Sequence, residues 1–101
     1  MKTMLPKEAF RKNAHIYKIL SHHKRLEILN LLKDGELSVE EILKTVKILK
    51  SNLSQHLTIL RYNGLVKTRK DGLNVHYKIV DKRIIEPCKI LHKLRIKHIV
   101  S

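Results

Sequence analysis

Residues 51–60 read SNLSQHLTIL, and this stretch decides what fold the rest of the chain is expected to adopt. Leu53, Leu57 and Leu60 recur at helical spacing, which predicts a short helix anchored on a core. The side chains expected on its outer face are polar: Ser51, Asn52, Ser54, Gln55 and His56. Hydroxyl and amide groups near a helix N-terminus can reach base edges and phosphates. The pattern is typical of a helix that reads a DNA groove, but taken alone it fits an ordinary surface helix equally well.

The residues before this stretch predict a second short helix. Ser38 and Glu41 match the S-x-x-E capping box, in which each side chain accepts a hydrogen bond from the other residue's backbone N–H. We expect this helix over residues 39–46 and a short link over residues 47–49. Two short helices joined by a turn of a few residues, the second with a polar outer face, form the helix-turn-helix pattern.

The residues after this stretch change from helical to strand periodicity. Gly64 or Asn63 can supply the left-handed conformation that ends the helix. Residues 65–70 and 73–80 then alternate as strands around Asp71-Gly72, a strong hairpin-turn signal. The hairpin is basic through Lys67, Arg69, Lys70 and Lys78. A charged run is usually a solvated face, but a basic hairpin beside a helix-turn-helix is typical of a wing that lies along DNA.

A central helix and two flanking helices complete the predicted fold, which is mainly α with a β-hairpin wing. Ser21 is expected to cap the central helix, whose dense apolar residues end at Asp34-Gly35. The first helix is expected over residues 7–19, behind Pro6, and the last from Pro87 onward. Each flanking helix carries an apolar stripe: Phe10, Ala14 and Tyr17 in the first, and Cys88, Leu91, Leu94 and Ile99 in the last. The stripe of the first helix exceeds what one small core requires, so we expect part of it to face a partner subunit. The last helix should pair with a first helix, either its own or that of a partner.

Composition narrows the class of partner. The 101 residues are expected to form one domain over residues 1–101, and their formal net charge is +13, from 22 Lys+Arg against 9 Asp+Glu. Such a charge favours nucleic acid, although an anionic membrane surface or ribosomal RNA would also fit. The single cysteine excludes an internal disulfide. No apolar run is long enough to span a bilayer, and we expect a cytoplasmic protein.

Residues 17–81 resemble the ArsR/SmtB family of winged helix-turn-helix repressors. The resemblance is carried, in order, by ILSH and RLEIL at 19–22 and 25–29, NLSQHL at 52–57, LR and GLV at 60–61 and 64–66, and YKI at 77–79. It implies a homodimer joined by the first and last helices, over residues 7–20 and 87–100, with two reading helices in successive major grooves of a palindromic operator. The residues then expected to contact DNA are Ser51, Asn52, Ser54, Gln55, His56, Arg61, Lys67, Arg69 and Lys70.

Within this family, the wording of the reading helix and the wing looks most like the thiol-based sensors of reactive sulfur and oxidants. By that resemblance, one sensing cysteine would stand at Asn30 and the other near Ile96, so both are missing here. Cys88 stands at a third place, where a packed small hydrophobe is the favoured interpretation. A disulfide between two copies of Cys88 would require a subunit contact that brings the pair within a few ångströms.

The metal sites implied by the resemblance are also incomplete. The helix-three thiolate site would need cysteines where Ser38 and Glu40 stand. In the last-helix zinc site only Asp81 persists, while Arg83, Leu94 and Lys97 occupy the other positions. A different half-site from Cys88, His92 and His98 is the less favoured alternative, because no second shell is visible. We therefore expect no metal and no cofactor.

The sequence predicts a sequence-specific transcriptional regulator, most simply a repressor that binds double-stranded DNA as a homodimer. No phosphate-binding loop, carboxylate pair or activated nucleophile points to an enzyme. The charge of +13 also fits a non-specific architectural or chromatin-like DNA-binding protein. A winged helix that binds only another protein is a further alternative, disfavoured by the charge. No residue pattern identifies an effector.

Overall fold

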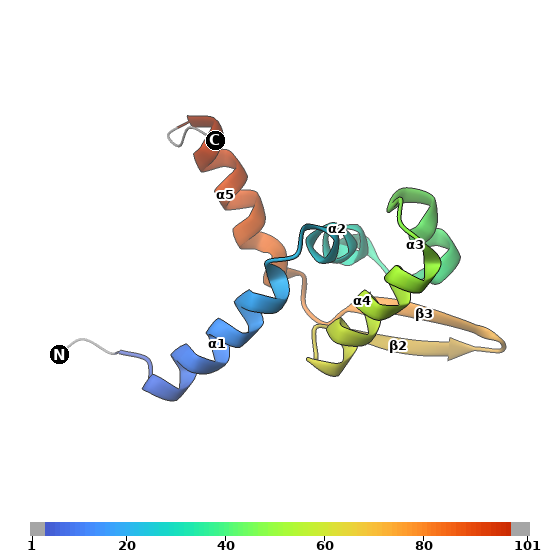
Figure 1. Ribbon diagram of the computed structural model, residues 1–101, viewed down its shortest axis with the longest axis horizontal. Helices are drawn as coiled ribbons and strands as arrows, with labels where there is room; N and C mark the ends of the chain where they lie inside the picture. The colour runs from blue at the N-terminus through green and yellow to red at the C-terminus, as the bar shows by residue number, and fades with distance from the viewer. Residues whose placement is uncertain (1–3, 98–101) are drawn as a thin grey trace.

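The computed structural model describes residues 4–97 and confirms the predicted fold class (Figure 1). Its α-helices are α1 (Lys7–Leu20), α2 (His23–Leu31), α3 (Val39–Thr45), α4 (Lys50–Tyr62) and α5 (Glu86–Lys97). Its strands are β1 (Leu37–Ser38), β2 (Val66–Asp71) and β3 (Asn74–Ile79), and two 3-10 helices, η1 (Leu32–Asp34) and η2 (Lys82–Ile85), follow α2 and precede α5. The predicted helices exist, and their ends agree with the prediction or differ from it by up to three residues.

The helix α2 is the central element, as predicted, but its cap is different. Ile28 and Leu29 of α2 are fully buried. The predicted cap at Ser21 is wrong, because the N-cap is His22, whose Nδ1 accepts a bond from the Lys24 backbone N–H at 3.2 Å. The Ser21 hydroxyl instead donates to the Lys18 carbonyl at the end of α1. The buried core of the protomer comprises Ile19, Ile28, Leu29, Leu32, Ile42, Val46, Leu53, Leu57, Leu60, Leu65, Val66, Ile79 and Ile85.

The predicted hairpin is present and gains a third strand. The sheet is antiparallel with the order β1-β3-β2, and Leu37 of β1 lies opposite Tyr77 of β3. Two residues are too short to show an alternating pattern, so β1 carried no signal in the sequence. Gly64 ends α4 with φ of 74° and Gly72 turns the hairpin with φ of 63°. Both conformations favour glycine because it has no Cβ.

The capping box of α3 is confirmed. The Ser38 hydroxyl accepts from the Glu41 N–H at 3.2 Å, and the Glu41 carboxylate accepts from the Ser38 N–H at 2.9 Å. The backbone bond from Ser38, followed by the bond from its side chain, lowers the pKa of Glu41. This box fixes the start of α3 immediately before the turn that leads to α4.

Replacing Ser38 with alanine should lower the free energy of unfolding by about 1 kcal/mol, because the Glu41 backbone N–H loses its side-chain acceptor. Urea unfolding followed by circular dichroism measures this change. The Ser21→Ala variant is the matched control, since Ser21 is exposed and its hydroxyl does not accept a hydrogen bond from the first turn of a helix. Equal stability of the two variants would contradict the assigned role of the box.

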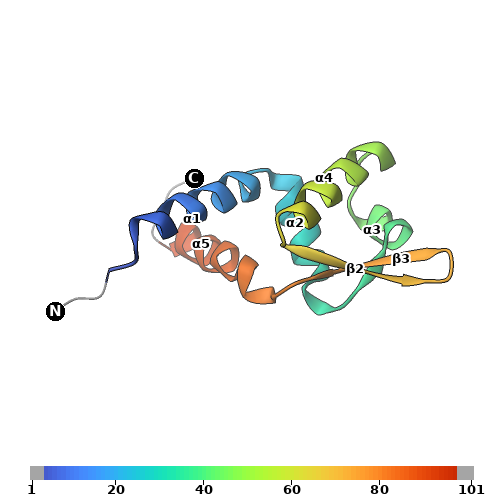
Figure 2. The same ribbon diagram turned by 90° about the horizontal axis from the view of Figure 1, so that it is seen from below.

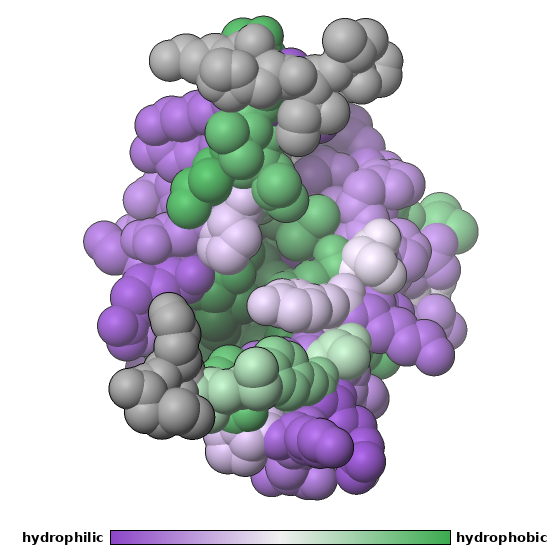
Figure 3. Space-filling view, turned by 90° about the vertical axis from the view of Figure 1, so that its left-hand side faces the viewer, coloured by the Kyte–Doolittle hydropathy of each residue, from purple (hydrophilic) through white to green (hydrophobic). Residues whose placement is uncertain are grey.

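The flanking helices α1 and α5 leave the same end of the protomer and diverge, as Figures 1 and 2 show together. The last helix begins at Glu86, one residue before the predicted Pro87. Large apolar side chains remain exposed on both helices: Phe10 and Tyr17 on α1, and Ile90, Leu91, Leu94 and Ile96 on α5. Apolar residues gather in a hollow on this face (Figure 3). The predicted stripe residue Ile99 lies outside the described residues.

Among residues 4–97, the helices are too short or too polar to qualify as a membrane crossing.

Candidate nucleic-acid interface

The helix α4 presents the predicted polar face. Leu53, Leu57 and Leu60 have no exposed surface, which anchors one side of the helix in the core. On the opposite side, the predicted contact residues Ser51, Asn52, Ser54 and Gln55 are exposed. The apolar spacing fixes the rotation of α4 about its own axis, so these four side chains project together from its first two turns.

The beginning of α4 keeps its backbone donors free of a side-chain cap. The N-cap is Leu49, whose side chain is 70% exposed and has no polar atom to offer. Lys50 begins the helix and pairs with Glu40 of α3 at 2.8 Å. Uncapped N–H groups and the positive end of the helix dipole suit an anion such as a DNA phosphate.

His56 differs from the other predicted contact residues because it is half-buried. Its Nδ1 accepts a hydrogen bond from Arg25 Nε of α2 at 3.2 Å. The ring of His22 stacks edge-on against it, with centroids 4.5 Å apart. Burial, followed by the charges of His22 and Arg25, lowers the pKa of His56. Nδ1 of the neutral ring is therefore engaged inside the protein.

The wing carries its predicted cations, but they are not equivalent. Arg69 donates to Glu36 Oε1 through Nε at 2.9 Å and through a second nitrogen. This contact lowers the pKa of Glu36 and raises that of Arg69. Lys67 and Lys70 are exposed, and among the described residues the ion pairs of the hairpin involve Arg69 rather than either lysine. Lys67 and Lys70 are thus the more available cations for a phosphate.

The predicted contact residue Arg61 lies apart from the first turns of α4. It is exposed in the last turn of the helix. The structure therefore brings together Ser51, Asn52, Ser54 and Gln55, and it places Arg61 at the far end of the same helix.

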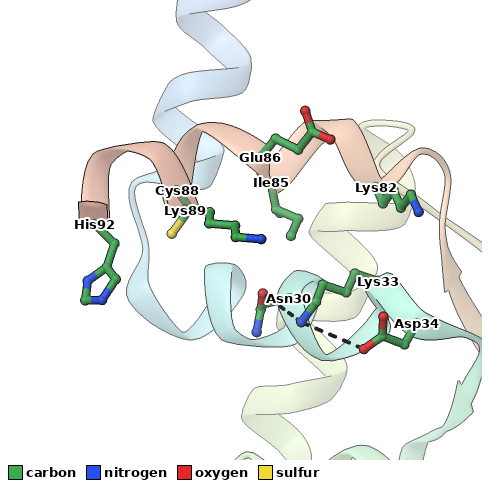
Figure 4. Close-up of a pocket in the computed structure, with 9 residues that line it drawn as sticks. All are labelled: Asn30, Lys33, Asp34, Lys82, Ile85, Glu86, Cys88, Lys89 and His92. Carbon is green, nitrogen blue, oxygen red and sulfur yellow. Dashed lines mark hydrogen bonds and ion pairs between the residues drawn. The ribbon is translucent and has the colours of Figure 1, made fainter. Parts of the chain in front are cut away.

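A cavity of about 530 Å³ separates α2 from α5 on another side of the protomer (Figure 4). Asn30 and Cys88 line it, together with Lys33, Lys89 and His92. Cys88 is exposed, so its interpretation as a packed hydrophobe does not hold in the protomer. Of the two sensing positions implied by the resemblance, Asn30 borders this cavity, whereas the Ile96 side chain is 71% exposed.

Asp81, the one residue that persists from the implied zinc site, is paired with Arg83, which stands at another position of that site. The Arg83 guanidinium donates three bonds to the Asp81 carboxylate, at 2.6 and 3.1 Å. This contact lowers the pKa of Asp81 to about 2. In the part of the chain that the structure describes, no three His, Cys, Asp or Glu side chains are grouped as metal ligands. His98, a member of the less favoured alternative site, lies outside the described residues.

Arg25 lies next to this interface, and the sequence did not indicate a role for it there. Besides His56, its guanidinium reaches the backbone carbonyl of Ile19 at 3.2 Å. In the sequence, Arg25 is visible only as a cation next to the buried stripe of the central helix. The residues that it contacts, Ile19 and His56, lie 6 and 31 positions away. A contact with a residue 31 positions away has no local pattern to predict it.

Known sequences that are similar to this chain are transcriptional regulators. A family model described as "Bacterial regulatory protein, arsR family" matches residues 19–68, from the end of α1 into β2. The transcriptional activator HlyU from Vibrio cholerae is 39% identical over 78% of this chain and 73% of its own length. The arsenical resistance operon repressor from Staphylococcus aureus is 40% identical over 77% of this chain and 74% of its own.

Solved structures share the arrangement of elements. HlyU from Vibrio cholerae superposes with a TM-score of 0.77 at 35% identity, covering 91% of this chain and 100% of that one. A homodimeric winged helix-turn-helix DNA-binding domain from Mycobacterium bovis gives 0.79 at 26% identity, covering 100% and 98%. The fold is therefore shared with winged helix-turn-helix proteins along nearly the whole chain.

Proposed function

Because this chain belongs to the ArsR family of winged helix-turn-helix transcriptional regulators, we propose that it binds a palindromic operator as a homodimer and represses transcription by excluding polymerase. The resemblance found in the sequence is thereby confirmed, and the chain is a DNA-binding regulator. The named relatives include an activator and a repressor, so repression, rather than activation, is part of what we propose. We place this activity in the cytoplasm and in one domain over residues 1–101.

The exposed polar face of α4 is the observation that carries this proposal. Its anchoring leucines are fully buried, which leaves Ser51, Asn52, Ser54 and Gln55 fixed on the outer side of the helix. Amide and hydroxyl groups on a rigid helix can pair with base edges in the major groove. His56, Arg61, Lys67, Arg69 and Lys70 are proposed as supporting contacts, mostly to phosphates.

The apolar surface of α1 and α5 supports the homodimer. Phe10 and Tyr17 are 51% and 67% exposed, and Leu91 of α5 is 55% exposed. Burying such a surface against a second copy removes apolar area from water and supplements a small core. The Mycobacterium bovis domain of the same fold is homodimeric. Two copies of α4 related by a two-fold axis would then read two half-sites.

The effector is left open in this proposal. The finer likeness to thiol-based sensors stays a prediction, because Asn30 and Ile96 stand where the implied cysteines would be. The relatives are named as regulators of transcription, which does not favour the alternative of a non-specific architectural protein.

Replacing Gln55 with alanine should cost about 1 to 3 kcal/mol of operator binding and relax base preference at one position of each half-site. The operator is first selected from a random-duplex library with the wild-type protein, and affinity is then measured on matched and mismatched duplexes. The Thr58→Ala variant is the control on the same helix, because the Thr58 hydroxyl donates back to the Ser54 carbonyl at 2.8 Å.

Replacing Lys70 with alanine tests a proposed phosphate contact, in contrast to the proposed base contact of Gln55. It should weaken binding to all sequences alike and reduce the slope of affinity against salt concentration by about one charge. Lys12→Ala is the matched control, since it removes the same charge from α1, at the other end of the protomer (Figure 1). If the Gln55→Ala variant also loses affinity equally for every sequence, α4 is not the reading helix.

A further inference from the structure

The contact between α1 and α4 depends on polar groups more than on apolar packing. Ile19 is the one buried residue of α1 among those described, while Phe10 and Tyr17 of the same helix are exposed. Ile16 and Leu20 also pack against the core, so apolar contacts hold the end of α1 but offer little to fix the angle of the rest of the helix. Two hydrogen-bonded connections between α1 and α4 take that role.

Arg25 makes the first connection. Its NH1 donates to the carbonyl of Ile19 at 3.2 Å, and its Nε donates to His56 Nδ1 at 3.2 Å. The Ile19 carbonyl belongs to the last turn of α1, where carbonyls lack intrahelical partners and a cation is favourable. One planar guanidinium thus joins the end of α1 to the middle of α4. A lysine, which concentrates its donors on one nitrogen, could not match this fork.

His15 makes the second connection. Its Nε2 lies 3.1 Å from Asn63 Oδ1, at the C-cap of α4. The Asn63 Nδ2 donates to the Ile59 carbonyl at 2.8 Å, which leaves Oδ1 as the acceptor. His15 therefore donates through Nε2. The connections meet α1 one turn apart, at residues 15 and 19, and α4 two turns apart, at residues 56 and 63. Two separated points fix a rotation that one point would leave free.

We propose that Arg25 and His15 are positioning residues that hold α1 at a fixed angle to α4 and thereby set the half-site spacing that the dimer accepts. This inference rests on the proposed function. In that dimer α1 lies at the subunit contact and α4 lies on the DNA, so the angle between them decides where the second α4 meets its groove. Inserting one base pair moves a half-site by about 3.4 Å and rotates it around the duplex. A rigid protomer should reject that displacement, whereas a loosened one should tolerate it.

The test measures spacing preference with four variants. Arg25→Met removes the guanidinium but keeps an apolar stem, and His15→Leu removes the donor at an exposed position. His15→Gln is the conservative counterpart, because its amide nitrogen can donate in place of Nε2. Glu8→Gln, at an exposed position of α1 away from α4, is the control. Each protein is titrated with the selected palindrome, with the same palindrome lengthened or shortened by one base pair, and with an isolated half-site.

The wild-type protein, His15→Gln and Glu8→Gln should prefer the selected spacing by about tenfold or more, a difference of about 1.4 kcal/mol. Arg25→Met and His15→Leu should lose most of that preference while binding the isolated half-site within about twofold of wild type. An unchanged preference in His15→Leu, which replaces an exposed side chain and should fold, overturns the proposal even if Arg25→Met fails to fold. So does a lowered melting temperature without a change in preference. Failure of the wild-type protein to select any palindrome would instead refute the proposed function.

The pH dependence of the spacing preference provides an independent test of the Arg25–His56 contact. Because Arg25 has only donors, His56 must be neutral at Nδ1 to accept its bond. The groups that face His56 are Arg25 of α2 and His22 at its N-cap, and both oppose a second positive charge. The neutral form is thus present at neutral pH and lost as the pH falls through the lowered pKa of His56. As the pH falls from neutral through the lowered pKa of His56, the wild type should lose spacing preference, and Arg25→Met should not change. A preference that does not respond to pH in the wild type would contradict the role of the Arg25 connection.

Discussion

Replacing Leu57 with alanine is expected to lower the free energy of unfolding by about 2 to 5 kcal/mol, which is a large part of the stability of a small domain. Leu57 lies at the centre of α4 and has no exposed surface. The truncation leaves a cavity in the buried cluster to which Leu53, Leu60 and Ile28 also belong. It also removes the middle of three anchors that fix the polar face of α4 outward. Urea unfolding at one fixed protein concentration measures the change, because a dimer's stability depends on concentration.

Leu73→Ala is the matched control for this variant. Leu73 lies at the tip of the wing and its side chain is 102% exposed, so the same truncation there should change stability by less than about 0.5 kcal/mol. A small effect at both positions would mean that α4 is not anchored in the core as described.

Replacing Leu94 with lysine is expected to separate the dimer and reduce affinity for the palindromic operator by about 10² to 10⁴-fold, because two half-sites would no longer be bound by linked subunits. Leu94 is 40% exposed on the apolar stripe of α5, where a second copy would bury it. An added lysine raises the positive charge of the protein, so a loss of binding could not come from weaker attraction to DNA. Light scattering after size exclusion gives the oligomeric state, and a titration with the selected duplex gives the affinity.

His92→Lys is the control on the same helix. It adds the same kind of charge at an exposed position that borders the cavity rather than the apolar stripe. That variant should stay dimeric and bind the operator at least as well as the wild type. A Leu94→Lys protein that remains a dimer would show that the proposed subunit contact is elsewhere.

Local patterns in the sequence predicted much of the fold. The leucine spacing of residues 53, 57 and 60 predicted the anchored helix, and Ser38 with Glu41 predicted the start of α3. Such features depend on residues three or four apart, and the interactions that produce them act over the same distance. The cap at His22 was missed because a serine stood next to it, and β1 was missed because it has two residues.

The candidate interface was predicted as a set of residues, but their different environments were not. Gln55 and Ser54 are exposed as expected, whereas His56 is held by Arg25 and Arg69 by Glu36. In the sequence, Arg69 and Lys70 are adjacent cations, and both are expected to be equally available to DNA. Only pairing with Glu36, 33 residues away, makes one of them less available to DNA.

The sequence by itself determined the order of the elements, the polar face of residues 51–56 and the excess of positive charge, because periodicity, capping and composition are properties of neighbouring residues and of simple sums. The tertiary structure alone decided which of those polar groups are free. It turned His56 toward Arg25, joined His15 to Asn63 and left the apolar stripes of α1 and α5 exposed. These outcomes depend on which helices pack together, and that is set by the whole core rather than by any one segment.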